Sequence, residues 1–204
     1  MVLAGVLIEE ADEPELKKLG VKDSKQLTAK KRKILAQEIL RIAKKIHVSI
    51  THPGEIDGRS KAGLNLNKIE AVKTAEIINA LNDGRENIEV VVDCPSNNIF
   101  KWHLYLMQFI KQPNNLTFKV EHKADVNHVA CSAASIIAKE NREREITKLK
   151  EKLGIDFGSG YPSDPKTIEF VKLNIDKFPD IFRKSWQTYK NIKNGKNQPT
   201  LSEF

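Results

Sequence analysis

The stretch KVEHKADVNHVACSAASIIAKENRERE, residues 119–145, decides the fold. It runs from the end of an alternating apolar segment through a carboxylate, Asp125, into a pattern of helical periodicity. One face of the predicted helix is apolar and small, because it carries Ala130, Ala133, Ala134, Ile137 and Ala138. A backbone can approach such a face closely, so we expect a sheet to pack against it.

Asp125 has two interpretations when it is taken alone. Its carboxylate can cap the helix by accepting hydrogen bonds from free N–H groups, which is the more common role of an aspartate at this position. Alternatively, it is a metal-binding or catalytic carboxylate at the end of a helix that packs in the core. The rest of the chain has to decide between the two roles.

Composition limits the class of protein. The 204 residues fit one domain, or a domain with a small appendage. The 40% hydrophobic and 30% charged content is typical of a soluble globular protein. The net charge of +7 favours a polyanionic partner, with nucleic acid as the first candidate. Cys94 and Cys131 have no metal-type spacing and indicate free thiols. The apolar run 2–8 is too short to cross a membrane, so we expect a cytoplasmic protein with no membrane partner.

The hydrophobic patterns predict strands and helices that follow one another along the chain, as in an open α/β sheet. We expect an acidic turn at 9–13, a glycine-punctuated loop at 57–63 and a helix from 29 to 44 capped by Thr28. The strands are predicted at 2–8, 46–51, 88–92 and 116–120, and the further helices at 64–81, 98–111, from about 129, and 167–175.

Two of the predicted strands are each followed by an aspartate. Asp93 follows the β-branched run 88–92, and Asp125 follows the strand at 116–120. Ligands gather at the carboxyl ends of strands in open α/β sheets, although Asp93 could equally cap a turn. Two such residues at one edge can share a divalent metal ion, because hard oxygen ligands must converge within a few ångströms.

Two later segments offer candidate substrate contacts. The loop GSGYPSDP, residues 158–165, holds Tyr161 between glycines and prolines. It can press the ring against a flat ligand, or it can simply be a turn that buries a tyrosine. In FPDIFRKSWQTYK, residues 178–190, Arg183 and Lys184 suit phosphate contact but can also be ordinary surface charges. The polar segment from 191 onward is typical of a mobile tail.

Five blocks in this order resemble ribonuclease HII of the archaeal type: VKDSKQLT, VVVD, EHKAD followed by SAASIIAKENRERE, GSGYPSDP and FRKSWQTY. The resemblance runs from residue 1 to the C-terminus. It implies an α/β fold with a ribonuclease H-like core at 1–153, in which helices flank a mixed sheet. It further implies a helical substrate-binding part at 154–190 and a flexible tail at 191–204. It also implies a monomeric endonuclease that cuts RNA strands or single ribonucleotides in duplexes with DNA.

The resemblance assigns roles to named residues. Asp93 and Asp125 match two of the four carboxylates that hold Mn²⁺ or Mg²⁺ in the family, where one ion activates water and the other stabilises the leaving oxygen. Tyr161 matches the tyrosine that stacks on the sugar at the RNA–DNA junction. The implied phosphate contacts are Lys25 and Lys123, and Arg183 and Lys184 can add to them.

The C-terminal tail resembles a peptide that binds the sliding clamp in many archaeal relatives. Gln198, Leu201 and Phe204 fit a Gln-x-x-Leu-x-x-aromatic pattern. The usual motif has two terminal aromatic residues and this chain has one, so weaker docking is expected.

One family motif has no match in the sequence. The family begins with a strand bearing Gly-x-Asp-Glu-Ala-Gly-Arg-Gly, which supplies the other two carboxylates, whereas Met1 aligns just after it. We therefore hypothesise that the chain starts at an internal methionine, which the codons upstream of Met1 would test. The alternative, from a different class, is an inactive nucleic-acid-binding or clamp-tethered remnant. A third candidate, a related resolvase, fits GSGYPSDP and SAASIIAK poorly.

Overall fold

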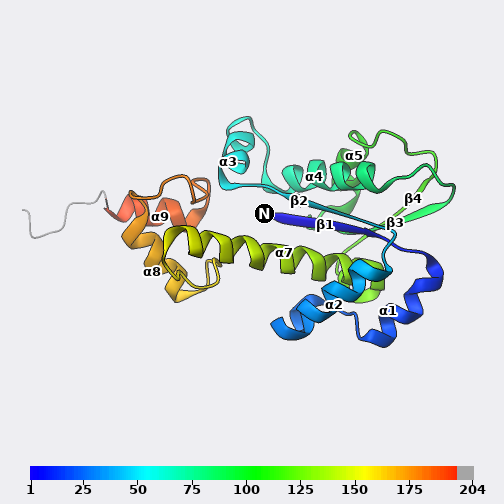
Figure 1. Ribbon diagram of the computed structural model, residues 1–204. Helices are drawn as coiled ribbons and strands as arrows, with labels where there is room; N and C mark the ends of the chain where they lie inside the picture. Colours follow the sequence, from blue (N-terminus) through cyan, green and yellow to red (C-terminus); the bar gives the residue numbers. More distant parts are fainter. Residues whose placement is uncertain (197–204) are drawn as a thin grey trace, which may run out of the picture. The chain divides into compact units, whose positions relative to one another are not determined.

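The computed structural model describes residues 1–196 (Figure 1). The chain forms two compact units. The first, the sheet unit, contains residues 2–50 and 65–143. The second, the helical unit, contains Met1, residues 51–64 and the described residues from 144 onward.

The sheet unit holds two pairs of strands. β1 (Val2–Leu7) pairs antiparallel with β2 (Lys45–Ile50), and β3 (Ile88–Asp93) pairs parallel with β4 (Leu116–Glu121). All four strands were predicted from the sequence, and the combination of parallel and antiparallel pairing confirms a mixed arrangement. Within residues 1–196, each pair forms its own two-stranded ladder.

Helices cover the strands of the sheet unit on two sides. Figure 1 shows α4 (Leu66–Leu81) and α5 (Ile99–Met107) on one side, and α1 (Glu13–Leu19), α2 (Ala29–Ile42) and α7 (Val129–Leu153) on the other. The 3₁₀ turns η1 (Glu10–Asp12) and η2 (Ser24–Gln26) and the short helix α6 (Ala124–Asn127) complete the unit. The Thr28 side chain caps α2 by accepting from Lys31 N at 3.3 Å, as predicted.

The cores of the sheet unit follow the hydrophobic pattern of the sequence. Ala4 and Val6 of β1, and Ile8 directly after it, pack against buried residues of α1, α2 and α7. Trp102 and Leu106 of α5 are buried with Val92 of β3 and with Ala71 and Ala75 of α4. The small face of α7 divides between two environments. Its residues 133 and 137 are buried in the core, whereas residues 130, 134 and 138 line a cavity.

The helical unit consists of α3 (Pro53–Lys61), the end of α7, α8 (Pro165–Asn174) and α9 (Gln187–Lys196). Its core is built on phenylalanines: Phe157 stacks on Phe170 with ring centroids 5.1 Å apart, and Phe182 lies 5.8 Å from Phe170. Aromatic side chains bury large areas, so a few of them are enough to hold a small helical core.

Three sequence-based expectations about local structure are wrong. The acidic turn at 9–13 is replaced by η1 and the start of α1, because Pro14 and the glutamates favour the first turn of a helix. Residues 57–61 of the expected loop lie in α3, where burial of Ile56 and Asp57 outweighs the low helix propensity of glycine. Residues 191–196 of the expected tail belong to α9.

Among residues 1–196, the structure contains no helix with the length and apolar character needed to cross a membrane. The predicted clamp-binding residues Gln198, Leu201 and Phe204 lie outside the described residues.

Candidate active site

The structure brings Asp93 and Asp125 together in the sheet unit. Asp93 is the last residue of β3, and Asp125 lies in α6, four residues after the end of β4. Parallel pairing of β3 with β4 places their carboxyl ends at the same edge. The Asp93 Oδ1 atom accepts a hydrogen bond from Ala124 N at 3.3 Å, so the first carboxylate is tied to the turn that carries the second. Both residues line the same cavity.

The turn from β4 to α6 is held by Glu121. Its Oε1 atom lies 3.0 Å from Asn127 Nδ2 and 3.1 Å from His128 Nε2. Hydrogen bonding from Asn127 is the main reason that the pKa of Glu121 lies below its usual range, so this carboxylate remains an acceptor at neutral pH. Lys123 enters the turn in the left-handed region with φ of 58° and is exposed.

Ser132 fixes the junction between α6 and α7. Its buried hydroxyl donates to the carbonyl of Asp125 at 2.7 Å. Glu121, His128 and Ser132 thus position Asp125, although sequence reasoning did not single them out. All three lie in the stretch 119–145, but only the folded turn shows which carboxylate and carbonyl they contact.

Asp125 does not act as the predicted helix cap. It lies inside α6, and within the described part of the chain its carboxylate forms an ion pair with Lys25, at 3.6 Å from Nζ to Oδ2. Burial is the main cause that raises the pKa of Asp125; the Lys25 charge opposes this, and the charges of Asp93 and Asp23 add to it. The Asp125 carboxylate is therefore buried, and the negative charges of Asp93 and Asp23 repel it.

Lys25 reaches Asp125 from a docked loop. The Ser24 hydroxyl lies 2.7 Å from the Ser135 hydroxyl on α7, and Asp23 Oδ1 accepts from Lys25 N at 2.9 Å. The Lys25 side chain is nevertheless 74% exposed, so its ammonium remains available to a ligand. The structure places Lys25, the predicted phosphate contact, beside Asp125. It adds Asp23, which the sequence interpretation missed although it belongs to the VKDSKQLT block.

Cys131 contributes no thiolate chemistry to this site. Burial, together with the charges of Asp93 and Asp125, raises the pKa of its thiol to about 12. The thiol therefore stays protonated at neutral pH, and a protonated thiol is a poor nucleophile and metal ligand.

The donor set of Asp93 and Asp125 fits one divalent cation. Magnesium commonly binds through one or two carboxylates, keeps several waters and completes its shell with substrate phosphate. Among residues 1–196, no group of three or more His, Cys, Asp or Glu side chains could hold a metal ion. The two-ion arrangement implied by the resemblance needs more carboxylates than this cluster supplies.

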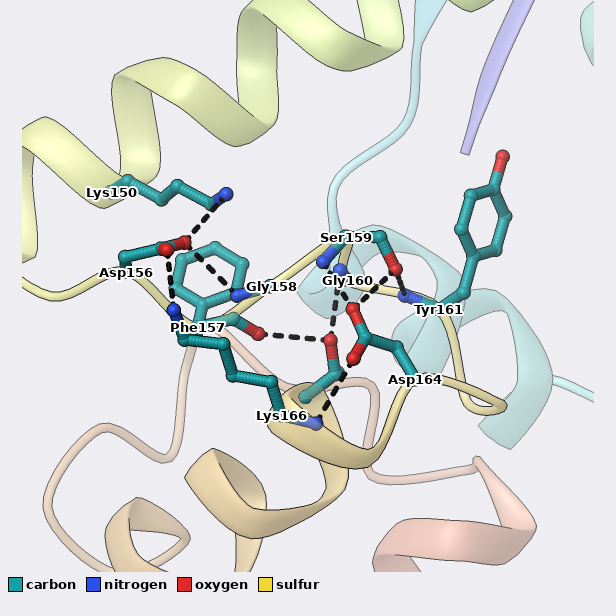
Figure 2. A network of polar contacts seen from close by, with 10 residues as sticks. Lys150, Asp156, Phe157, Gly158, Ser159, Gly160, Tyr161, Asp164 and Lys166 are labelled. Carbon is teal, nitrogen blue, oxygen red and sulfur yellow. Dashed lines mark hydrogen bonds and ion pairs between the residues drawn. The ribbon is translucent and has the colours of Figure 1, made fainter.

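The helical unit presents Tyr161 on a rigid loop. The Asp164 Oδ2 atom accepts from Ser159 N at 2.6 Å and from Ser159 Oγ at 2.7 Å, and Oδ1 accepts from Lys166 N at 3.0 Å. These bonds hold the pKa of Asp164 at about 2. Figure 2 shows the Tyr161 ring pointing away from this network, and the residue is 40% exposed. The exposed ring rules out the interpretation of Tyr161 as a buried turn residue.

Gly158 makes the loop closure around Asp164 feasible. Its φ of +82° is in the left-handed region, and an added Cβ would lie 2.4 Å from Asp164 Oδ2. Asp156 anchors the start of the loop: it accepts from Gly158 N at 3.1 Å and pairs with Lys150 at 2.8 Å and Lys166 at 2.5 Å (Figure 2).

Arg183 and Lys184 lie beside a buried carboxylate of the same unit. Asp57 accepts from Lys184 N at 2.7 Å and from Ser185 N at 2.9 Å, and Arg183 Nε donates to Ser185 Oγ at 3.0 Å. The Lys184 side chain is exposed and Arg183 is half-buried. The two backbone hydrogen bonds to Asp57 order this segment. The Lys184 ammonium lies 3.7 Å from the exposed Asp180 and can still reach a phosphate.

The model of the family described as Ribonuclease HII matches residues 1–189. The chain belongs to the ribonuclease HII family. This family cleaves RNA in RNA/DNA hybrids, so the chain is by family a type 2 ribonuclease H endoribonuclease and a hydrolase.

Individual relatives agree with this family. A ribonuclease HII of Methanococcus maripaludis strain C7 is 43% identical, with 94% of this chain and 80% of the relative covered. The crystal structure of ribonuclease H2 from Pyrococcus horikoshii OT3 aligns with a TM-score of 0.81 and 33% identity over 98% of this chain and 100% of that one. A structure of the PCNA:RNase HII complex from Archaeoglobus fulgidus aligns with a TM-score of 0.80 and 41% identity over 100% of this chain and 92% of that one. These likenesses confirm the predicted ribonuclease H-like α/β fold.

Proposed function

We propose that this chain hydrolyses the RNA strand, or single embedded ribonucleotides, of duplexes with DNA at the Asp93–Asp125 edge of the sheet unit. The observation that carries the proposal is the convergence of these two carboxylates, one exposed and one buried, beside the exposed ammonium of Lys25. The net charge of +7 supports a polyanionic substrate.

Asp93 and Asp125 would hold a divalent cation, Mg²⁺ or Mn²⁺, which supplies Lewis-acid polarisation of the phosphodiester and a more acidic water when bound. Glu121 and Ser132 keep Asp125 in place through the α6 turn. Lys25 neutralises Asp125 and can exchange this carboxylate for a substrate phosphate oxygen, since its side chain is largely exposed.

The other proposed substrate contacts belong to the helical unit and to the α6 turn. The exposed Tyr161 ring offers a flat surface for the sugar at an RNA–DNA junction, where the 2′-hydroxyl distinguishes RNA from DNA. Lys123, Arg183 and Lys184 offer positive charge for the phosphate backbone, which carries much of the affinity in such complexes. These roles rest on exposure and charge together with the family resemblance.

Cleavage of a defined duplex tests the proposal. A duplex with one embedded ribonucleotide is expected to be cut there in Mg²⁺ or Mn²⁺, while an all-DNA duplex of the same sequence stays intact and a chelator stops the reaction. If the purified chain binds the ribonucleotide duplex but leaves it intact with either metal, it is an inactive nucleic-acid-binding member of the family.

The C-terminal segment is proposed to tether the chain to a sliding clamp. Gln198, Leu201 and Phe204 fit a clamp-binding pattern, and the related Archaeoglobus fulgidus protein was solved as a complex with PCNA. Deletion of residues 198–204 is expected to remove association with the archaeal clamp, measured by surface plasmon resonance, and to leave cleavage unchanged. Phe204→Ala alone should weaken association about tenfold, as loss of one anchor side chain does. Equal association of the deleted and full chains would contradict the tether.

A further inference from the structure

Side-chain oxygens set the shape of the loop that carries Tyr161. Four successive backbone N–H groups, those of residues 158–161, each donate to a side-chain oxygen of the helical unit (Figure 2). The pairs are Gly158 N with Asp156 Oδ1 at 3.1 Å, Ser159 N with Asp164 Oδ2 at 2.6 Å, Gly160 N with Thr167 Oγ1 at 3.0 Å and Tyr161 N with Ser159 Oγ at 3.4 Å. A surface loop can leave such groups to water, so this set of bonds indicates that the loop holds one conformation.

Asp164 joins this loop to the start of α8. Its Oδ2 atom accepts from Ser159 N and, at 2.7 Å, from the Ser159 hydroxyl, whereas its Oδ1 atom caps α8 by accepting from Lys166 N at 3.0 Å. The backbone N–H of Asp164 donates to the Tyr161 carbonyl at 3.2 Å. The N–H and the carbonyl of Tyr161 are therefore both tied to Asp164, the N–H through the Ser159 hydroxyl.

Thr167 attaches the same loop to the interior of the helical unit. Its buried hydroxyl accepts from Gly160 N and donates to the Phe157 carbonyl at 2.9 Å. Phe157 belongs to the phenylalanine core of this unit. Gly158 and Gly160 have φ of +82° and +71°, a backbone conformation that glycine adopts without strain. The loop is thus fixed at both of its ends, with Tyr161 between them.

We propose that Asp164 is a positioning residue for Tyr161, which holds the backbone on both sides of the tyrosine and so presents its ring in one orientation to the sugar at an RNA–DNA junction. The inference rests on the proposed function, in which the Tyr161 ring contacts that sugar. A contact group that is already ordered loses less entropy when the substrate binds. A displacement of about 1 Å can lower a reaction rate by about a hundredfold, so the orientation of such a group affects cleavage.

Capping of α8 does not by itself account for Asp164. Serine caps a helix about as well as aspartate, and it does so with a single oxygen. The carboxylate has another oxygen, and that oxygen accepts both bonds from Ser159. These bonds are the main cause that lowers the pKa of Asp164 to about 2, so the carboxylate is ionised and a strong acceptor at neutral pH. A carboxylate repels phosphodiesters, so its charge serves the loop and not the contact with nucleic acid.

Asp164→Ser separates the capping role from the positioning role in the full chain. The serine oxygen keeps the cap of α8, so the variant is expected to fold, but it cannot also accept from Ser159. Amide hydrogen exchange at residues 159–161 should become about tenfold faster, because their bonds depend on that acceptor. The kcat/KM for cleavage at a single embedded ribonucleotide should fall about tenfold, because the ring samples other orientations.

A double-mutant cycle with Tyr161→Ala gives a readout that a purely structural role would not move. Tyr161→Ala alone should lower kcat/KM at least as much as Asp164→Ser does. Asp164→Ser should then cause no further loss in the Tyr161→Ala background, because its effect passes through the ring. A general defect in the helical unit would instead lower kcat/KM by the same factor with either residue at position 161.

The outcomes separate this inference from the proposed function. Equal losses from Asp164→Ser in both backgrounds, or an unchanged kcat/KM in Asp164→Ser while Tyr161→Ala lowers it, would overturn the positioning role alone. No effect of Tyr161→Ala would reject the sugar contact and the positioning role together. If the chain binds the duplex without cutting it, the same cycle is measured on its preference for the ribonucleotide duplex over the all-DNA duplex, and the lack of any preference would overturn the inference.

Ser159→Ala replaces Asp164→Ser if that variant does not fold. It removes the hydroxyl that links Tyr161 N to Asp164 and leaves the cap of α8 intact. Its loss of kcat/KM should also disappear in the Tyr161→Ala background, and a loss that persists there would overturn the positioning role.

Discussion

Asp93→Asn is expected to reduce cleavage at a single embedded ribonucleotide by about a thousandfold or more, a loss of about 4 kcal/mol of transition-state stabilisation. The substitution keeps the shape of the side chain and its hydrogen bond with Ala124 N, but it removes the charge that would bind a divalent cation. Single-turnover rates with saturating Mg²⁺ or Mn²⁺ measure the effect. Asp83→Asn is the matched control, because Asp83 is a surface carboxylate of the same unit that pairs with Arg85. Equal losses in both variants would contradict a specific role for Asp93.

Asp125→Asn should abolish cleavage to the same extent but stabilise the fold. The pKa of Asp125 is raised, first by burial and then by its charged neighbours, so its ionised form is disfavoured in the folded state. A carboxyl group with a raised pKa favours folding below its unfolded pKa and loses that contribution as the pH rises through its folded pKa. The variant is therefore expected to melt at a higher temperature than the wild type at pH 7, and the difference should vanish as the pH falls below the ordinary value of 3.8.

The two variants together separate a metal-binding role from a structural one. A residue needed only for folding would lose activity and thermal stability together. Loss of activity with increased stability at neutral pH identifies a carboxylate that is kept for its charge despite the cost to the fold. A lower melting temperature for Asp125→Asn would show that the ion pair with Lys25 outweighs the burial of the charge.

Asp57→Ala is expected to destabilise the helical unit by about 2–3 kcal/mol, because it leaves Lys184 N and Ser185 N without their charged acceptor. Burial raises the pKa of Asp57, but the hydrogen bonds from Ser185 and Lys184 and the charge of Arg183 outweigh this and lower it overall. A lowered pKa gives stabilisation that is present above the ordinary value of 3.8 and is lost as the pH falls through the folded value. Thermal unfolding followed by circular dichroism, with hydrogen exchange of α3, measures the loss at pH 7.

Asp180→Ala provides the control for Asp57. The Asp180 side chain is 94% exposed and contacts only the Lys184 ammonium among its described partners, so its removal should change stability little. The difference in stability between wild type and Asp57→Ala should narrow as the pH falls below the ordinary value of 3.8 and through the lower folded pKa of Asp57. A pH-independent difference would mean that packing, and not the hydrogen-bonded charge, accounts for the effect of Asp57.

The sequence by itself determined the strands, most helices and the family. The β-branched run before Asp93 and the alternating run before Asp125 predict two strands that end in carboxylates, and the structure has both. The five ordered motifs identify the family from the sequence, because five blocks at matching spacing are far more specific than composition. Local patterns were sufficient here because strand alternation and helix periodicity are read from neighbouring residues.

Other features depended on contacts between residues distant in the chain. The buried Asp57 carboxylate accepts hydrogen bonds from Lys184 N and Ser185 N, more than a hundred residues later, and no local sequence pattern predicts that pairing. Asp125 pairs with Lys25 and does not cap a helix, because the loop after α1 docks on α7 through Ser24. The sequence predicts that a sheet packs against the face of small residues on the helix. Only the tertiary structure shows that Ala130, Ala134 and Ala138 of this face line a cavity that β1 and β3 also line. Local periodicity sets which residues share a face, whereas the element that covers that face depends on how the whole chain packs.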